Sequence, residues 1–123
     1  MSKDKKKILA IDDEVDLLDI IHVWLTERGF EVVTASNGKE ALKQLETIRP
    51  DLVLLDLLMP HMSGLEILNQ IKKNPKTKSI RVAILTVKGD TQSIDEALRQ
   101  GAADCLIKPF EQDDLYAIVD RTL

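Results

Sequence analysis

The chain has 123 residues and a formal net charge of −4, with 44% hydrophobic and 31% charged residues. This length fits one domain of ordinary size, the hydrophobic fraction is too high for a disordered chain, and the negative charge argues against direct binding of nucleic acid. The charged first residues lack the apolar stretch of a signal peptide, and no run approaches the roughly 18 apolar residues that span a bilayer. The chain has one cysteine, Cys105, which cannot form an internal disulfide, and we therefore expect a cytoplasmic protein. We expect the lysine-rich segment 3–7 to be a solvated tail.

Short apolar segments alternate with amphipathic ones along the chain. The apolar segments are typical of strands buried on both faces, and they cover residues 6–11, 30–35, 52–56, 80–85 and 105–107. The amphipathic segments predict a helix up to about residue 28, helices over 39–49, 64–74 and 91–100, and a last helix that reaches residue 123. This alternation predicts an α/β fold, with a five-stranded parallel sheet covered by helices on both faces.

Polar side chains stand where four of these five strands end. Asp12 and Asp13 follow the first strand, Asp56 ends the third, Thr86 follows the fourth and Lys108 follows the fifth. The carboxyl ends of parallel strands meet at one edge of the sheet, where ligands of open α/β sheets bind. An isolated aspartate at a strand end is more often a turn cap, but this grouping favours a functional site.

The chemistry of such a group is restricted by its charge. Two carboxylates about 4 Å apart repel by roughly 4 kcal/mol at an effective dielectric of 20, so a cation has to compensate them. Mg²⁺ prefers carboxylate oxygens together with water and phosphate oxygens, and Lys108 adds a positive charge. These parts match phosphoryl transfer, with Asp56 as the acceptor at the central strand and Asp12 and Asp13 beside the metal.

The same residues resemble a known family over the whole chain. The ordered set resembles the receiver domain of bacterial two-component response regulators: Asp12-Asp13, Asp56, Met59-Pro60, Gly64, Thr86 and Lys108-Pro109-Phe110. The resemblance implies a single receiver domain over residues 1–123, with a flavodoxin-like three-layer (βα)5 fold and strand order 2-1-3-4-5. It also implies a function: the domain takes a phosphoryl group from a partner phosphohistidine in a phosphorelay and then changes its affinity for partners.

The resemblance assigns a role to each matching position. Asp56 is the phosphoacceptor, Thr86 and Lys108 contact the phosphoryl group, and the Lys108–Pro109 peptide is cis. The resemblance implies that Mg²⁺ is bound by Asp13, by Asp56 and by the backbone carbonyl of Leu58, and that Asp12 acts mainly through a metal-bound water.

Three positions depart from the family pattern. Cys105 stands where an aromatic residue usually reports phosphorylation, so the switch formed with Thr86 lacks its aromatic part. Val87 is bulkier than the small residue usual after the threonine, and Leu58 replaces a residue that is commonly polar. From Val87 and Leu58 we predict a long-lived aspartyl phosphate.

The first predicted helix carries two apolar stripes. One faces the core and comprises Val15, Leu18, Ile21 and Leu25. The opposed stripe predicts a binding surface, since this side of a surface helix is normally polar, and comprises Leu17, Ile20, Val23 and Trp24. The resemblance implies that this surface docks a histidine kinase or a histidine phosphotransfer domain. It also implies that helix four, strand five and helix five form an output face for a downstream protein or domain, or for a homodimer.

Two other functions remain to be weighed. A haloacid-dehalogenase-type phosphatase also uses an aspartate nucleophile, but Leu58 stands where that family has its second acid, so we expect no turnover enzyme. The stronger alternative is an interaction module with the receiver fold and a lost or retuned switch, which Cys105 and Val87 motivate. The last predicted helix reaches residue 123, which fits either an excised domain or a complete small protein.

Overall fold

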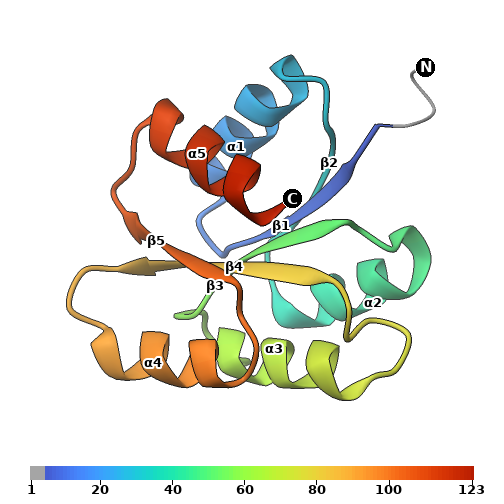
Figure 1. Cartoon of the computed structure of the whole chain (residues 1–123), viewed down its shortest axis with the longest axis vertical. Coiled ribbons are helices and arrows are strands. Elements are labelled where there is room, and N and C mark those ends of the chain that lie inside the picture. The colour runs from blue at the N-terminus through green and yellow to red at the C-terminus, as the bar shows by residue number, and fades with distance from the viewer. Residues whose placement is uncertain (1–4) are drawn as a thin grey trace.

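The computed structural model of the chain describes residues 5–123, so the first part of the lysine-rich segment lies outside the described residues. Helices and strands alternate (Figure 1), in the order β1 (Lys7–Ile11), α1 (Val15–Glu27), β2 (Glu31–Ala35), α2 (Gly38–Ile48), β3 (Leu52–Asp56), α3 (Gly64–Lys73), β4 (Arg81–Val87), α4 (Thr91–Arg99), β5 (Asp104–Lys108) and α5 (Gln112–Thr122). The strands pair in parallel in the order β2-β1-β3-β4-β5. The predicted α/β class and strand order 2-1-3-4-5 are therefore confirmed.

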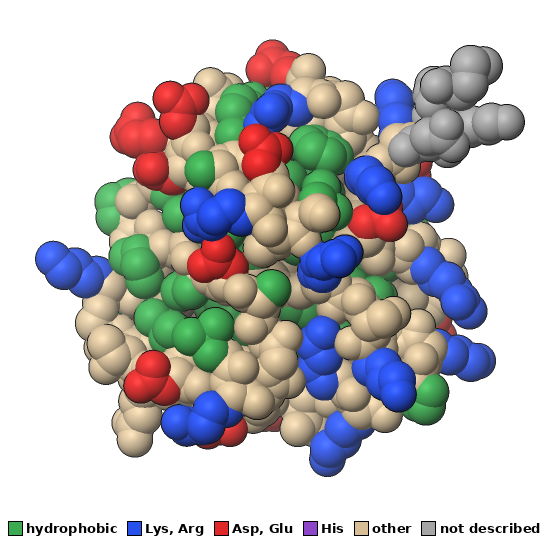
Figure 2. All heavy atoms as spheres, viewed as in Figure 1, with side chains coloured by type: hydrophobic (Ala, Val, Ile, Leu, Met, Phe, Trp, Pro, Cys, Tyr) green, Lys and Arg blue, Asp and Glu red, His purple; other side chains and the backbone are tan. Residues whose placement is uncertain are grey.

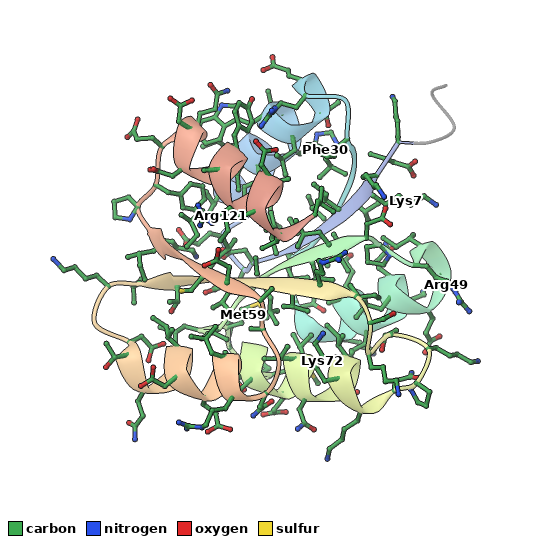
Figure 3. The ribbon with its side chains drawn as sticks, viewed as in Figure 1. Lys7, Phe30, Arg49, Met59, Lys72 and Arg121 are labelled. Carbon is green, nitrogen blue, oxygen red and sulfur yellow. The ribbon has the colours of Figure 1, made fainter. Side chains whose placement is uncertain are left out.

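The helices form two layers around the sheet. α1 and α5 cover one face, and α2, α3 and α4 cover the other (Figure 1). In Figure 3, Phe30 and Arg121 lie with the first layer, whereas Met59 and Lys72 lie on the side of α3. Each layer encloses its own cluster of buried apolar side chains, so the sheet is buried on both faces.

The central strand β3 shows why an apolar run ends in an acid. All five of its residues are buried, and they alternate between the two faces: Val53 and Leu55 pack towards α2–α4, Leu52 and Leu54 towards α1 and α5. This alternation follows from the two-residue period of a strand. Asp56 ends the strand at the edge of both cores.

The start of α3 lies directly against this strand end. Ser63 caps the helix by accepting a hydrogen bond from the backbone N–H of Glu66. A Cβ atom added to Gly64 would overlap the carbonyl oxygen of Asp56 and lie 2.7 Å from the Cα of Leu57. Only glycine permits this close approach, so Gly64 fixes the position of the backbone that carries Asp56.

Some details of the sequence prediction are wrong. Predicted helix and strand ends differ from the observed ones by at most two residues, and Thr86 and Lys108 lie within β4 and β5 rather than after them. The apolar stripe predicts that Val15 faces the core, but it is 56% exposed, because it begins α1 one turn before Leu18, the first residue of this face that is buried. Helical spacing predicts that Leu98 faces inward beside Ala97, but it is 44% exposed, because α4 buries only Ala97.

Within residues 5–123, none of the helices has the length and apolar character needed to cross a bilayer.

Candidate functional site

Three aspartates meet at the carboxyl edge of the sheet. β1 and β3 are neighbours, so Asp12 and Asp13, which follow β1, lie beside Asp56 at the end of β3. One carboxylate oxygen from each of the three lies within 4.8 Å of the others. Asp12 and Asp56 are buried, whereas Asp13 is exposed. The grouping predicted from the strand ends is therefore present, with one member facing solvent.

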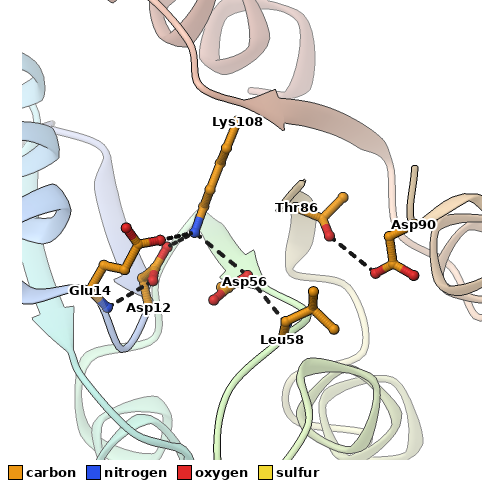
Figure 4. A network of polar contacts seen from close by, with 7 residues as sticks. All are labelled: Asp12, Glu14, Asp56, Leu58, Thr86, Asp90 and Lys108. Atoms are coloured by element: carbon orange, nitrogen blue, oxygen red, sulfur yellow. Dashed lines mark hydrogen bonds and ion pairs between the residues drawn. The ribbon is translucent and has the colours of Figure 1, made fainter. Parts of the chain in front are cut away.

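Lys108 reaches into this acid cluster from β5. Its Nζ lies 2.6 Å from Asp12 Oδ2, 2.9 Å from Glu14 Oε1 and 3.7 Å from Asp56 Oδ1 (Figure 4). Asp12 also accepts a hydrogen bond from the backbone N–H of Glu14, which orients the loop after β1. The contact of Glu14 with Lys108 was not predicted; the only signal in the sequence was a third acid directly after Asp12 and Asp13.

The pKa values of the acids reflect burial and crowding. Burial, followed by the charge of Asp12, raises the pKa of Asp56 from 3.8 to about 7, against the opposing effects of Lys108 and of the Leu58 N–H. Burial also raises the pKa of Asp12, although its hydrogen bond with Lys108 acts in the opposite direction. Burial lowers the pKa of Lys108, but hydrogen bonds to Asp12 and Glu14 outweigh it, and the net shift is upward. One lysine therefore compensates the cluster only in part.

Thr86 lies at the same edge but is turned away from the acids. Its side chain is fully buried, and its hydroxyl donates a hydrogen bond to Asp90 Oδ2 at 3.2 Å. Figure 4 shows this hydroxyl pointing towards Asp90 and away from Asp56. The contact of Thr86 with a phosphoryl group thus remains a prediction, and Asp90 is a site residue that the sequence analysis missed.

Two aliphatic side chains next to site residues are exposed. Leu58 is 53% exposed, and its backbone N–H donates to Asp56 Oδ1 at 3.3 Å. Val87, the residue after Thr86, is 46% exposed. Exposed aliphatic side chains at these two positions provide no group that could hold a water by a hydrogen bond.

Cys105 occupies the position expected to carry an aromatic residue. It pairs with Ile84 in the sheet and packs against the apolar cluster between the sheet and the α2–α4 layer. Burial, followed by the negative charges of Asp104 and Asp90, raises the pKa of its thiol. A half-buried thiol with a raised pKa is a poor nucleophile.

The outer stripe of α1 is exposed only in part. Ile20 and Val23 are exposed, whereas Leu17 and Trp24 are half-buried and pack on the core beneath α1 and α5. A groove of about 370 Å³ runs from this helix to the acid site and is lined by Glu14, Leu17, Ile20, Trp24, Val87, Lys108, Pro109 and Phe110. Val23 lies outside the groove. A second groove, of about 460 Å³, lies between α2 and α3 and includes none of the site residues.

The fold and the site together define a class of protein: a flavodoxin-like domain with an acid cluster, a lysine and a threonine at the carboxyl edge of its sheet. The family model for the response regulator receiver domain matches residues 8–120, and the chain belongs to this family. The Lys108–Pro109 peptide is cis, as the resemblance implied.

Known proteins are similar over nearly the whole chain. The probable transcriptional regulator ycf27 of Cyanophora paradoxa is 38% identical over 123 residues, which are all of this chain and 50% of that protein. The Bacillus subtilis regulatory protein PhoP for alkaline phosphatase synthesis is 36% identical over 118 residues, 96% of this chain and 48% of that protein. The structure of the chemotaxis protein CheY4 of Vibrio cholerae matches with a TM-score of 0.91 at 30% identity and covers 97% of this chain and 99% of that one. The chain spans about half the length of these curated relatives.

Proposed function

We propose that Asp56 accepts a phosphoryl group from a phosphohistidine of a partner protein, in the cytoplasm. Receiver domains are the regulatory phosphoacceptors of two-component systems, and this chain is one of them. The observation that carries the assignment to Asp56 is its place: a buried carboxylate at the end of the central strand, 3.7 Å from the Nζ of Lys108. A carboxylate oxygen of Asp56 attacks phosphorus, the P–N bond to the donor imidazole breaks, and the leaving imidazole takes up a proton.

The acid cluster fits Mg²⁺. Its donors are hard carboxylate oxygens within 4.8 Å of one another, and the charge of Asp12 adds to the effect of burial in raising the pKa of Asp56. Asp13, Asp56 and the backbone carbonyl of Leu58 would hold the ion, and Asp12 would act through a bound water. When bound, Mg²⁺ supplies positive charge that neutralises the transferred phosphoryl group.

Lys108 and Thr86 contribute the protein's own donors. Lys108 holds Asp12 and Glu14 in the free domain, and a phosphoryl group on Asp56 brings three oxygens within reach of the same ammonium. The Thr86 hydroxyl donates to one of these oxygens after it leaves Asp90. Both contacts stabilise charge that exists only once the group is being transferred.

The aliphatic residues Leu58 and Val87 favour a long-lived aspartyl phosphate. Hydrolysis requires a water in line with the P–O bond to Asp56. A polar side chain near the phosphoryl group can position this water by a hydrogen bond. The exposed side chains of Leu58 and Val87 offer no hydrogen bond to such a water. We therefore expect loss of phosphate to be slow compared with domains that have polar and small residues at these two positions.

Two surfaces are proposed for partners. The first is the exposed part of the α1 stripe with the adjoining groove, which would dock a histidine kinase or a histidine phosphotransfer domain, because the groove leads from Ile20 and Trp24 to Lys108.

The second is the face of α4, β5 and α5, where Leu98 and Ile107 are exposed and hydrophobic side chains come to the surface (Figure 2). It would bind an output protein or domain, or a second copy of the chain. Relatives named DNA-binding response regulators make a transcriptional output one candidate, with DNA bound outside this domain.

Phosphorylation with a small donor tests the proposal. The protein is incubated with Mg²⁺ and acetyl phosphate or phosphoramidate, and intact mass is measured for the wild type and for Asp56→Asn. We expect one added phosphoryl group in the wild type and none in the variant. Equal modification of both would place the acceptor elsewhere, and no modification of the wild type would favour the alternative of an interaction module without a phosphorylation switch.

A further inference from the structure

The turn after β4 brings Asp90 back to the buried threonine. The backbone N–H of Asp90 donates to the carbonyl of Val87 at 3.4 Å, and Gly89, the third residue of this turn, has φ +98°. Glycine adopts this conformation without strain, which is why it is favoured at this position of a turn. The turn reverses the chain so that the carboxylate of Asp90 meets the hydroxyl of Thr86 at 3.2 Å.

The carboxylate of Asp90 is used for Thr86 rather than for the helix that follows. Asp90 immediately precedes α4, a position where aspartate usually accepts hydrogen bonds from the first backbone N–H groups of a helix. Here its side chain makes no capping bond, and its backbone, at φ −86° and ψ 51°, lies outside the extended region usual for capping residues. The local backbone therefore directs the acid towards β4.

The contact with Asp90 competes with the proposed contact to a phosphoryl group. The Thr86 side chain is fully buried and has a single O–H donor, so the hydroxyl cannot donate to Asp90 and to a phosphoryl oxygen at once. Residue 105 is a cysteine, so no aromatic side chain at this position can fix the threonine in either orientation.

We infer that Asp90 is a positioning residue of the switch: it holds the Thr86 hydroxyl away from Asp56 until a phosphoryl group is present, and so sets how readily the domain is activated. The inference rests on the proposed function. It explains how a domain without the family's aromatic residue restrains its threonine in the free state. It also predicts that loss of the Asp90 carboxylate makes the activated state easier to reach.

A double-mutant cycle with beryllofluoride tests this role. Beryllofluoride with Mg²⁺ stands in for the phosphoryl group on an aspartate, and ¹⁹F NMR counts the bound fluoride directly. Affinity is compared for the wild type, Asp90→Ala, Thr86→Ala and the double variant. Asp95→Ala is the control, because Asp95 is an exposed acid of the same helix, and thermal unfolding checks that each variant is folded.

We expect Asp90→Ala to bind beryllofluoride about tenfold more tightly than the wild type, equivalent to about 1.4 kcal/mol. We expect the same substitution to change affinity less than about twofold in the Thr86→Ala background, as expected for a contact made only through that hydroxyl. Unchanged affinity in Asp90→Ala, or an equal increase in both backgrounds or in Asp95→Ala, overturns the inference, because the effect would then be absent or due to charge alone. Failure of the wild type to bind would instead overturn the proposed function, and this inference with it.

Discussion

Replacing Asp56 by asparagine should stabilise the folded domain at neutral and alkaline pH in the absence of metal. Burial and the neighbouring charges raise the pKa of Asp56 to about 7, so ionisation of this carboxyl group destabilises the folded state. Asparagine removes the charge at nearly the same volume and keeps an oxygen that can accept the hydrogen bond from the Leu58 N–H. The substitution that abolishes the proposed phosphorylation is therefore expected to make the protein more stable.

The size of the effect follows from the pKa shift. The folded state binds a proton more tightly than the unfolded chain, so wild-type stability falls as pH rises from about 4 to about 7, and the full penalty applies above pH 7. At 1.36 kcal/mol per pH unit, the shift from 3.8 to about 7 gives an upper bound of about 4 kcal/mol. Water access at the mouth of the site and relaxation of Lys108 reduce this bound, so we expect a gain of about 2–4 kcal/mol.

Urea unfolding measures this directly. The free energy of unfolding of Asp56→Asn should exceed that of the wild type at pH 8 in EDTA, and the difference should largely disappear near pH 4. Mg²⁺ should narrow the gap at pH 8 by stabilising the wild type. Asp19→Asn, which removes an exposed acid of α1, should change stability by less than about 0.5 kcal/mol. If Asp56→Asn is no more stable than the wild type at pH 8, the charged form of Asp56 does not destabilise the folded state and the reasoning is refuted.

Three further predictions concern the backbone, the phosphate lifetime and the partner surface. Gly64→Ala should cost more than about 2 kcal/mol in urea unfolding, since the new Cβ overlaps the acceptor's backbone carbonyl; a neutral substitution would show that this backbone can move. Leu58→Asn combined with Val87→Ala should shorten the phosphate half-life by about tenfold or more, equivalent to about 1.4 kcal/mol in the barrier, and wild-type loss within seconds would contradict a slow site. Ile20→Asp and Trp24→Ala should each reduce phosphotransfer from the cognate kinase by about tenfold, equivalent to about 1.4 kcal/mol, while acetyl phosphate labels both normally; undiminished kinase transfer would remove α1 from the docking surface.

The grouping of the acids could be predicted because it depends only on topology. Short apolar runs locate the strands, parallel strands end at one edge, and Asp12, Asp13 and Asp56 follow from these two facts. The core residues of β3 follow in the same way, since both of its faces are covered.

The partners of individual polar side chains could not be predicted in this way. The bond between Thr86 and Asp90 depends on a turn with Gly89 at positive φ, and the contact of Lys108 with Glu14 depends on the direction of the loop after β1. Hydrophobic periodicity predicts neither the conformation of the turn after β4 nor the direction of the loop after β1. Periodicity also overestimates the core at the end of a helix, as the exposure of Val15 shows.

Chemical trapping of the phosphorylated residue tests the central claim most directly. Borohydride reduces an aspartyl phosphate to homoserine, and peptide sequencing by mass spectrometry then locates the reduced residue. After phosphorylation with a small donor and Mg²⁺, homoserine should appear at position 56 alone. Homoserine at position 12 or 13, or none in a protein whose mass shows phosphorylation, would contradict the assignment of Asp56 as the acceptor.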